Sequence, residues 1–206
     1  MSDFNEVIKA WREDDAVNRI HPTREHQGEE AYWASGEAQA KQILWLVPKK
    51  AHVIDFGAGD GRLAIPLHNA GLKVLAVDSS KEMLQRITDR EPEIATMFSN
   101  GNDLPKKYGE DSEKADALIS RAVLIHHSYK DVGRLLKKFA EVVKPGGLLI
   151  VDLPISDRPA ERSDWIGVTT WERSILLETT KMAGWEPIDA DSSPSTWKRV
   201  DDSDVL

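Results

Sequence analysis

Gly57, Gly59 and Gly61 lie between a short apolar segment and the start of a predicted helix. Glycine permits positive φ and close approach of the backbone to a ligand, and free N–H groups at a helix start favour a negative group. Asp78 ends the next apolar segment, where a carboxylate can accept hydrogen bonds from two vicinal ribose hydroxyls. The spacing predicts a site for a ribose-containing ligand. The structural alternative is a glycine turn beside a helix-capping Asp78.

The spacing of the glycines also limits which ligand is expected. A dinucleotide-binding loop reads G-x-G-x-x-G, whereas this loop reads G-x-G-x-G and has Arg62 where the third glycine would stand. A bulky side chain there would hinder approach of a pyrophosphate, and the loop also lacks the G-K-[ST] of a P-loop. We therefore expect a ligand without a diphosphate, which disfavours a nicotinamide oxidoreductase.

Five short apolar segments, typical of strands buried on both faces of a parallel sheet, surround these residues. They are residues 51–56, 73–77, 94–98, 115–119 and 148–151. Amphipathic helices are predicted between them, which indicates a doubly wound α/β sheet with right-handed crossovers. Ligands of such sheets bind beyond the carboxyl ends of the strands, so the residues that follow each strand are the candidates.

Several helix and strand boundaries can be placed as well. Ser79 and Glu82 have capping-box spacing before one helix, and residues 131–143 form another that ends at Lys144–Gly147. A further helix is expected over residues 169–183, with Trp171, Ile175, Leu176 and Met182 facing inward. Residues 185–190 and 197–200 are expected to form two final strands.

The composition excludes several classes of protein. The chain has 206 residues and no Cys, which excludes a disulfide scaffold, a Cys-ligated zinc site and a cysteine nucleophile. With 27 Lys and Arg against 35 Asp and Glu, the net charge of −8 argues against non-specific nucleic-acid binding. Neither a signal peptide nor a membrane-spanning segment is recognised, so a cytoplasmic protein is expected.

The order of the motifs resembles the class I (seven-stranded) S-adenosylmethionine-dependent methyltransferases, most of all the small-molecule and quinone-type group. The resemblance covers residues 50–154 and rests on the segments Asp55–Gly61, Val77–Ser80 with Met83 and Leu84, Asn102–Pro105, Ala115–Ser120, Val123–His126 and Val143–Gly147. It implies a doubly wound, mostly parallel seven-stranded sheet with helices on both faces and a reversed last strand, which residues 197–200 could supply. It also implies one domain over residues 1–206, with a helical lid in 1–50, a cofactor-binding core in 51–154 and a substrate side in 155–206.

The resemblance assigns roles around S-adenosylmethionine and its product S-adenosylhomocysteine. The residues that it places around the cofactor are Tyr32, Trp33, Asp55, Gly57, Ala58, Gly59, Asp78, Ser79, Met83, Asn102, Asp103, Leu104, Ser120 and Arg121. The glycines and Ala58 would line the methionine part, Asp55 would hold its amino group, and Asp78 would bind the ribose. Ser79, Met83, Asp103 and Leu104 would border the adenine. Tyr32 and Trp33 would belong to the lid, or else to an ordinary packed surface helix.

Methyl transfer from a sulfonium is a displacement with an activated leaving group, so proximity and orientation supply much of the rate. A base is needed only when the nucleophile carries a proton. His126 and His127 follow the fourth strand and are the candidate bases; the alternative for His126 is a structural role. Arg121 could bind an acidic substrate group or a carboxylate of the fold. No metal is expected, because the fourth strand ends in Ser120–Arg121 rather than in an acid.

The sequence therefore predicts an enzyme that methylates an O or N atom of a small molecule. The insert at residues 154–168, with Arg158, Arg162 and Trp165, is expected on the substrate side. Two alternatives remain: a protein-directed methyltransferase, and a methyltransferase-like fold that binds ligands without catalysis.

Overall fold

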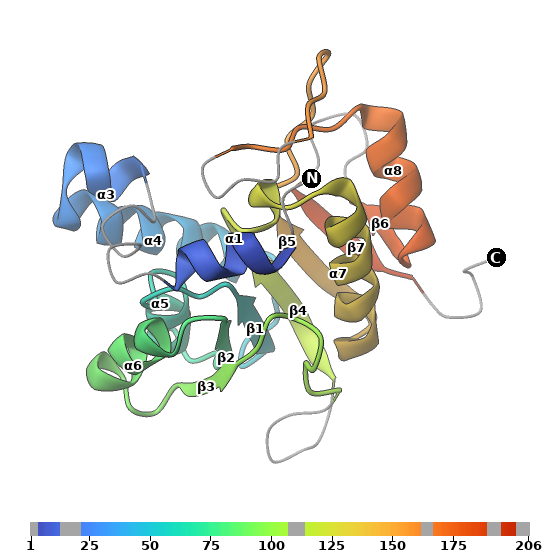
Figure 1. Ribbon diagram of the computed structural model, residues 1–206. Helices are drawn as coiled ribbons and strands as arrows, with labels where there is room; N and C mark the ends of the chain where they lie inside the picture. Colours follow the sequence, from blue (N-terminus) through green and yellow to red (C-terminus); the bar gives the residue numbers. More distant parts are fainter. Residues whose placement is uncertain (1–3, 13–21, 107–113, 162–166, 189–194, 201–206) are drawn as a thin grey trace.

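The architecture of the computed structural model is a central sheet with helices on both faces (Figure 1). The structure describes residues 4–12, 22–106, 114–161, 167–188 and 195–200. The seven strands are β1 (His52–Phe56), β2 (Lys73–Asp78), β3 (Ala95–Phe98), β4 (Ala115–Ser120), β5 (Val143–Val151), β6 (Trp185–Pro187) and β7 (Thr196–Arg199). The helices are α1 (Phe4–Trp11), α3 (Pro22–Gln27), α4 (Glu29–Leu44), α5 (Ala64–Asn69), α6 (Lys81–Arg90), α7 (Tyr129–Val142) and α8 (Arg173–Met182), with the 3-10 turn η1 (Leu124–His126).

The sheet has the strand order β3-β2-β1-β4-β5-β7-β6. Strands β1 to β5 pair in parallel, whereas β7 runs antiparallel to both β5 and β6. This is the predicted doubly wound sheet with a reversed last strand. The order reverses between β1 and β4, which brings the loops after these two strands together at the switch point.

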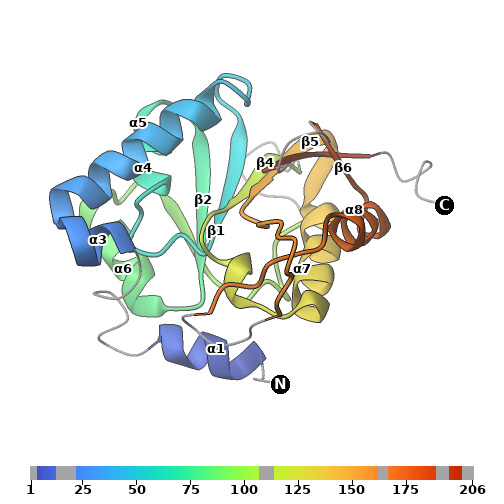
Figure 2. The same cartoon turned by 90° about the horizontal axis from the view of Figure 1, so that it is seen from above.

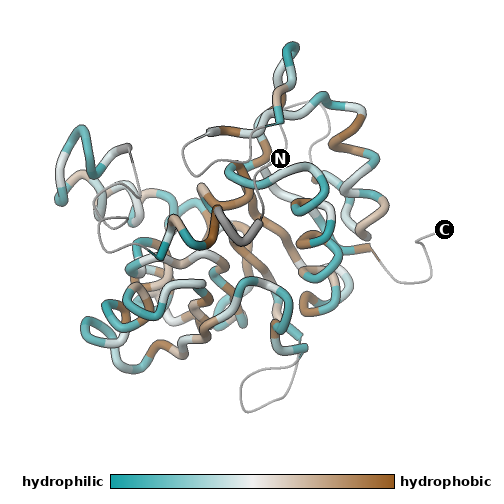
Figure 3. The backbone as a smooth tube through the Cα atoms, viewed as in Figure 1, coloured by the Kyte–Doolittle hydropathy of each residue, from teal (hydrophilic) through white to brown (hydrophobic). Residues whose placement is uncertain are grey.

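Both faces of the sheet are buried, which explains why its strands show continuous apolar runs. Along β1, Ile54 and Phe56 pack into the cluster beneath α7 and α8, while Val53 packs into the cluster beneath α4, α5 and α6. Figure 2 shows these two groups of helices on opposite sides of the sheet, and Figure 3 shows the hydrophobic residues along the central strands. Burial on both sides fixes β1 and therefore the position of the loop that follows it.

Several predicted boundaries differ from the structure. Ser80, not Ser79, caps α6, because its hydroxyl accepts the backbone N–H of Met83. Strand β5 begins at Val143 instead of 148, since Val143 already pairs with Ala115 across an irregular register. The two predicted final strands correspond to β6 and β7. Residues 189–190 of the first prediction lie outside the described ranges.

The predicted inward face of α8 is half wrong. Trp171 is fully buried but precedes the helix, which begins at Arg173 and not at 169, and Leu176 is fully buried on it. Ile175 and Met182 are exposed. A helix turns about 100° per residue, so Leu176 and Thr180 define the buried stripe. Ile175 and Met182 lie well to the side of that stripe.

In the described part of the chain, no helix combines the length and the apolar character that a membrane crossing requires.

Candidate active site

The glycine loop after β1 adopts a conformation that side chains disfavour. Gly57, Gly59 and Gly61 have φ of 76°, 56° and 97°. The backbone N–H groups of Gly57 and Ala58 both donate to the carbonyl oxygen of Val77, at 2.8 and 3.0 Å. These bonds hold the loop against the end of β2 and open it toward the carboxyl edge of the sheet.

Asp78, at the end of β2, is bonded directly to this loop. One carboxylate oxygen accepts the N–H of Gly59 at 2.9 Å and the other accepts the N–H of Ser80 at 2.8 Å. Desolvation raises the pKa of Asp78, and these backbone hydrogen bonds oppose that effect. Because each carboxylate oxygen has a second lone pair, Asp78 can still accept hydrogen bonds from a ligand.

A pocket lies between these loops and α1. The predicted site residues that line it are Tyr32, Asp55, Gly57, Ala58, Gly59, Asp78, Ser79, Met83, Arg121 and His127. The lining residues that sequence reasoning missed are Ile8, Trp11, Phe56, Arg62, Leu63, Ser99, Asn100, Ala122 and Val123. Helix α1 closes one side of the pocket, and the side chain of Arg12 fastens it by donating to the carbonyl oxygen of Ser79 at 2.7 Å.

Six predicted site residues lie outside this lining: Trp33, Asn102, Asp103, Leu104, Ser120 and His126. The Trp33 indole donates to Glu29 at 2.7 Å, Asn102 accepts from Arg134, and Asp103 accepts from the hydroxyl of Ser99. Leu104 packs against the core and Ser120 is fully buried. Ser99 and Asn100 line the pocket, where the resemblance predicts Asn102, Asp103 and Leu104.

The two candidate bases occupy different environments. His127 lines the pocket and is 6% exposed, and desolvation lowers its pKa to about 4. Its imidazole is therefore neutral at pH 7. His126 instead has its Nδ1 at 3.0 Å from the carbonyl oxygen of Gly167, and its ring lies 5.3 Å from that of Trp11. These two contacts support a structural role for His126, and His127 is the candidate base that lines the pocket.

Asp152, at the end of β5, holds the turn after β4. Its carboxylate accepts from the Arg121 guanidinium at 2.6 Å and from the backbone N–H of Ala122 at 2.8 Å. Ala122 has a φ of 56°, which is strained for a residue with a Cβ. Of the two partners predicted for Arg121, an acidic substrate group or a carboxylate of the fold, the structure shows the second. Of the predicted substrate-side insert, Arg162 and Trp165 lie outside the described residues.

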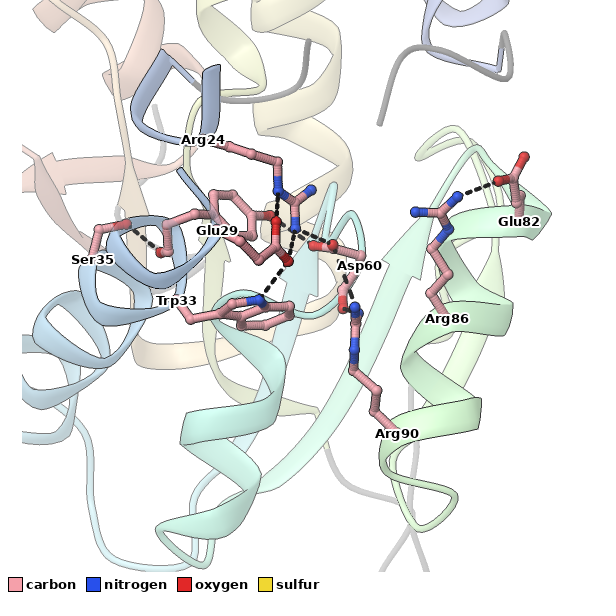
Figure 4. A network of polar contacts seen from close by, with 9 residues as sticks. Arg24, Glu29, Trp33, Ser35, Asp60, Glu82, Arg86 and Arg90 are labelled. Carbon is pink, nitrogen blue, oxygen red and sulfur yellow. Dashed lines mark hydrogen bonds and ion pairs between the residues drawn. The ribbon is translucent and has the colours of Figure 1, made fainter. Parts of the chain in front are cut away.

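Asp60, inside the glycine loop, connects three helices to the site (Figure 4). It is fully buried and accepts the hydroxyl of Tyr32 and the guanidinium of Arg24, both at 2.7 Å. Its backbone carbonyl accepts from Arg90 at 3.1 Å. Sequence reasoning expected the Tyr32 hydroxyl to contact the cofactor carboxylate, but that hydroxyl donates to Asp60. The signal in the sequence that could have identified Asp60 is its position as an acidic residue between two glycines of the loop.

Replacing Asp60 with Asn is expected to destabilise the fold by about 3 kcal/mol, because one partner of a buried ion pair is lost. The side chain of Arg24 is 9% exposed, so its charge would stay desolvated while it keeps only the half-exposed carboxylate of Glu29, at 2.7 Å, among the described ion pairs. Urea unfolding would measure the change. Glu82→Gln is the matched control, since it removes an exposed pair with Arg86 that is worth about 0.5 kcal/mol. Equal effects of the two substitutions would contradict a supporting role for Asp60.

Asp55, at the end of β1, is 2% exposed and lines the pocket. Its carboxylate is hydrogen-bonded to the backbone of Ala64, but Oδ2 has no hydrogen-bond partner among the described residues. Desolvation is the main cause that raises the pKa of Asp55 to about 7, and the charge of Arg62 opposes it. Such a carboxylate favours a cationic or hydrogen-bonding ligand group.

The sheet order, the glycine loop and the pocket at the switch point agree with the fold that the resemblance predicts, that of class I S-adenosylmethionine-dependent methyltransferases. Residues 53–147, somewhat less than half of the chain, match the family model of the methyltransferase domain.

Two sequence relatives and two solved structures illustrate the similarity. An uncharacterized methyltransferase of Mycobacterium tuberculosis is 32% identical over 60% of this chain and 47% of its own length. A ubiquinone biosynthesis O-methyltransferase of Chelativorans sp. is 26% identical over 48% of this chain and 38% of its own length. The chain thus spans less than half the length of these relatives.

Among solved structures, 1,6-didemethyltoxoflavin-N1-methyltransferase of Burkholderia thailandensis has a TM-score of 0.66 at 20% identity, over 98% of this chain and 92% of that one. Magnesium protoporphyrin IX methyltransferase of Synechocystis has a TM-score of 0.65 at 16% identity, over 92% of this chain and 89% of that one. The first was solved with 1,6-didemethyltoxoflavin and S-adenosylhomocysteine bound, and the second with S-adenosylmethionine. At these identities the likeness shows the fold.

Proposed function

We propose that this chain binds S-adenosylmethionine and transfers its methyl group to an O or N atom of a small molecule. The observation that carries the proposal is the direct bond between Asp78 and the N–H of Gly59, which joins a ribose-binding carboxylate to a glycine loop inside one pocket. The residues present fit the cofactor. Asp55 offers an unpaired carboxylate oxygen, and a Cβ on Gly59 would meet no atom within 4 Å, so the loop has free space beside it.

When bound, the cofactor supplies a methyl group on a sulfonium, which needs no further activation. The chain's own residues bind and orient it. Asp78 would accept hydrogen bonds from the hydroxyls, Asp55 would hold the amino group, and Met83 and Ser79 would border the adenine. Van der Waals contact and hydrogen bonding at this pocket would hold the reacting atoms in line, which is the main source of rate for such a displacement.

The lining of the pocket supports a small substrate. Ile8 and Trp11 of α1 contribute apolar side chains to this lining, and His127 lines the same pocket. A neutral imidazole can accept a proton from a hydroxyl or amine, although a pKa of about 4 makes His127 a weak base that suits an acceptor already prone to lose its proton. The two structural neighbours named above also methylate small molecules by name.

Calorimetric titration of the purified chain with S-adenosylmethionine, S-adenosylhomocysteine and NADH tests the proposal. S-adenosylmethionine and S-adenosylhomocysteine are expected to bind, and NADH is not expected to bind. At about a hundredfold excess over Kd, the ligand should add about 2.7 kcal/mol of stability in a melting experiment. Absence of binding by well-folded protein would overturn the proposal. Binding of the cofactor without turnover of any small acceptor would favour the protein-directed or non-catalytic alternatives.

The affinity for S-adenosylhomocysteine is expected to rise about tenfold between pH 6 and pH 8, because Asp55 must be ionised to hold an ammonium group and its pKa is about 7. In the unliganded protein the sign is opposite. A carboxyl whose pKa is raised on folding stabilises the fold at low pH, and that contribution falls as the pH rises from about 4 toward 7. Calorimetry at a series of pH values would check this. Asp55→Asn should bind weakly and without this pH dependence; an unchanged profile in that variant would contradict the assignment.

A further inference from the structure

Strand β3 forms one edge of the sheet and pairs only with β2 among the described strands. Figure 1 shows it at the opposite end of the sheet from β6. An edge strand presents a row of N–H and C=O groups, which proteins normally protect by shortening the strand or by placing lysine or proline in it. Strand β6 has three residues and contains Pro187, whereas β3 contains no charged residue, proline or glycine. Of the two edges, β3 is therefore the one suited to accept another strand.

The backbone of β3 shows which of its residues offer hydrogen bonds to such a strand. The N–H of Ser99 donates to the carbonyl oxygen of Asp78 at 3.0 Å, so Ser99 faces β2. Along an edge strand, successive residues direct their N–H and C=O groups alternately toward the neighbouring strand and away from it. Met97 therefore also faces β2, whereas Thr96 and Phe98 direct these groups away from the sheet. A second strand would bond to Thr96 and Phe98.

The C-terminal end of β3 is apolar and basic. The side chain of Thr96 is exposed, and Phe98 is 43% exposed although it is aromatic. The guanidinium of Arg12 and the ammonium group of Lys81 each lie 5.2 Å from the centroid of the Phe98 ring. Two cations thus surround an exposed aromatic ring at this end of the edge.

The N-terminal end of β3 is acidic. Glu91 and Glu93 lie just before the strand, and the side chain of Glu93 is 87% exposed. Its described ion-pair partner is His68, 3.9 Å away, which carries a charge only when it is protonated. The edge therefore changes from acidic to basic along its length. Two copies of such an edge attract each other when they run antiparallel, because each acidic end then faces a basic end.

We propose that two copies of this chain pair their β3 strands antiparallel, about a two-fold axis at Met97, to form a homodimer with one continuous sheet. In this register Thr96 of each copy lies opposite Phe98 of the other, and two residues paired in this way exchange both of their backbone hydrogen bonds. All outward groups of the strand are then used, and each Phe98 ring packs beside a β-branched residue. A two-fold pairing of this kind closes on itself and stops at a dimer.

This interface adjoins the pocket without being part of it. Ser99 and Asn100, which line the pocket, directly follow β3, so a second copy would lie next to this wall. None of the residues assigned to the interface is among those that line the pocket. The proposed dimer is therefore independent of the proposed function, and failure of cofactor binding would not affect it.

Sedimentation equilibrium of the whole chain over a series of concentrations tests the proposal. The wild-type chain is expected to reach a mass of about twice 23.1 kDa. Thr96→Pro is expected to abolish the dimer and to keep the fold, because the N–H that it removes points away from β2 and proline is tolerated at such edge positions. Thr96→Val retains that N–H, so it is the matched control and should dimerise like the wild type. Circular dichroism would check that both variants are folded.

Reversal of charge tests the antiparallel orientation. Glu93→Lys and Lys81→Glu are each expected to weaken dimerisation about tenfold, because two-fold symmetry turns each substitution into two like-charge contacts. The double variant restores opposite charges and is expected to dimerise within about threefold of the wild type. Glu178→Lys reverses an exposed charge on α8, at the other end of the sheet, and should leave the equilibrium unchanged.

A wild-type chain that stays monomeric at every concentration would overturn the proposal, including the case in which the edge accepts a strand from a different protein. A dimer that persists in both Thr96→Pro and Glu93→Lys would also overturn it, because its interface would then lie elsewhere. If both charge-reversed single variants are weakened and the double variant does not recover, the antiparallel pairing is wrong.

Discussion

Asp78→Ala is expected to weaken the binding of S-adenosylhomocysteine at least about a hundredfold. Hydrogen bonds to a charged group are worth about 1.5–3 kcal/mol each, and two of them to ribose hydroxyls account for this loss. The substitution also leaves the N–H groups of Gly59 and Ser80 without their acceptor. The loop would then lose one of the bonds that hold it beside β2, while the bonds of Gly57 and Ala58 to Val77 remain, so binding at the methionine end would weaken too. Calorimetry measures the affinity directly.

Two variants are compared with Asp78→Ala: Asp78→Asn, which keeps part of the hydrogen bonding, and Asp89→Ala, which is the control. Asn keeps one acceptor oxygen, so it can retain a single backbone bond and is expected to bind with intermediate affinity. Asp89 is an exposed acid on α6 that accepts a hydrogen bond from Gln85 and does not line the pocket, so its removal should leave binding unchanged. A hundredfold loss in Asp89→Ala, or less than a tenfold loss in Asp78→Ala, would contradict a ribose-binding role for Asp78.

The part of the fold that could be predicted from sequence is the part set by local pattern. The apolar runs ending at Phe56, Asp78 and Ser120 are buried on both faces, as is typical of strands in the middle of a parallel sheet. Once the strands are placed, the residues at their carboxyl ends follow. This explains why Asp55, Asp78 and the glycines lie together in the pocket.

The remaining wall of the pocket depends on contacts between distant segments, which local pattern does not encode. Helix α1 is short, and nothing in its sequence indicates that Ile8 and Trp11 face the pocket. For Arg62, the sequence shows an arginine after a glycine loop, whereas its burial depends on the approach of Gly36 from α4. The loop after β3 likewise contributes Ser99 and Asn100, because its path is set by its turn and not by periodicity.

Gly57→Ala is expected to destabilise the fold by about 3 kcal/mol and to abolish cofactor binding. An alanine with φ near 76° costs about 1 kcal/mol or more, since left-handed backbone crowds a Cβ. In addition, the new Cβ would stand 2.3 Å from Cγ2 of Val123, and overpacking of this kind costs about 1–3 kcal/mol. Either the glycine loop or the turn after β4 must shift, and both line the pocket. Urea unfolding and calorimetry would measure the two effects.

Two further substitutions distinguish backbone strain from collision. Gly71→Ala has a φ of 90° in open space, so it should show only the strain of about 1 kcal/mol and leave binding intact. Val123→Ala in the Gly57→Ala background removes the colliding methyl groups and is expected to recover most of the difference between the two glycine variants. Failure of this suppressor would mean that the cost lies in the loop backbone alone. Success would show that contact between the loops after β1 and β4 fixes the shape of the pocket, which is the physical reason that the fold places its ligand at the switch point.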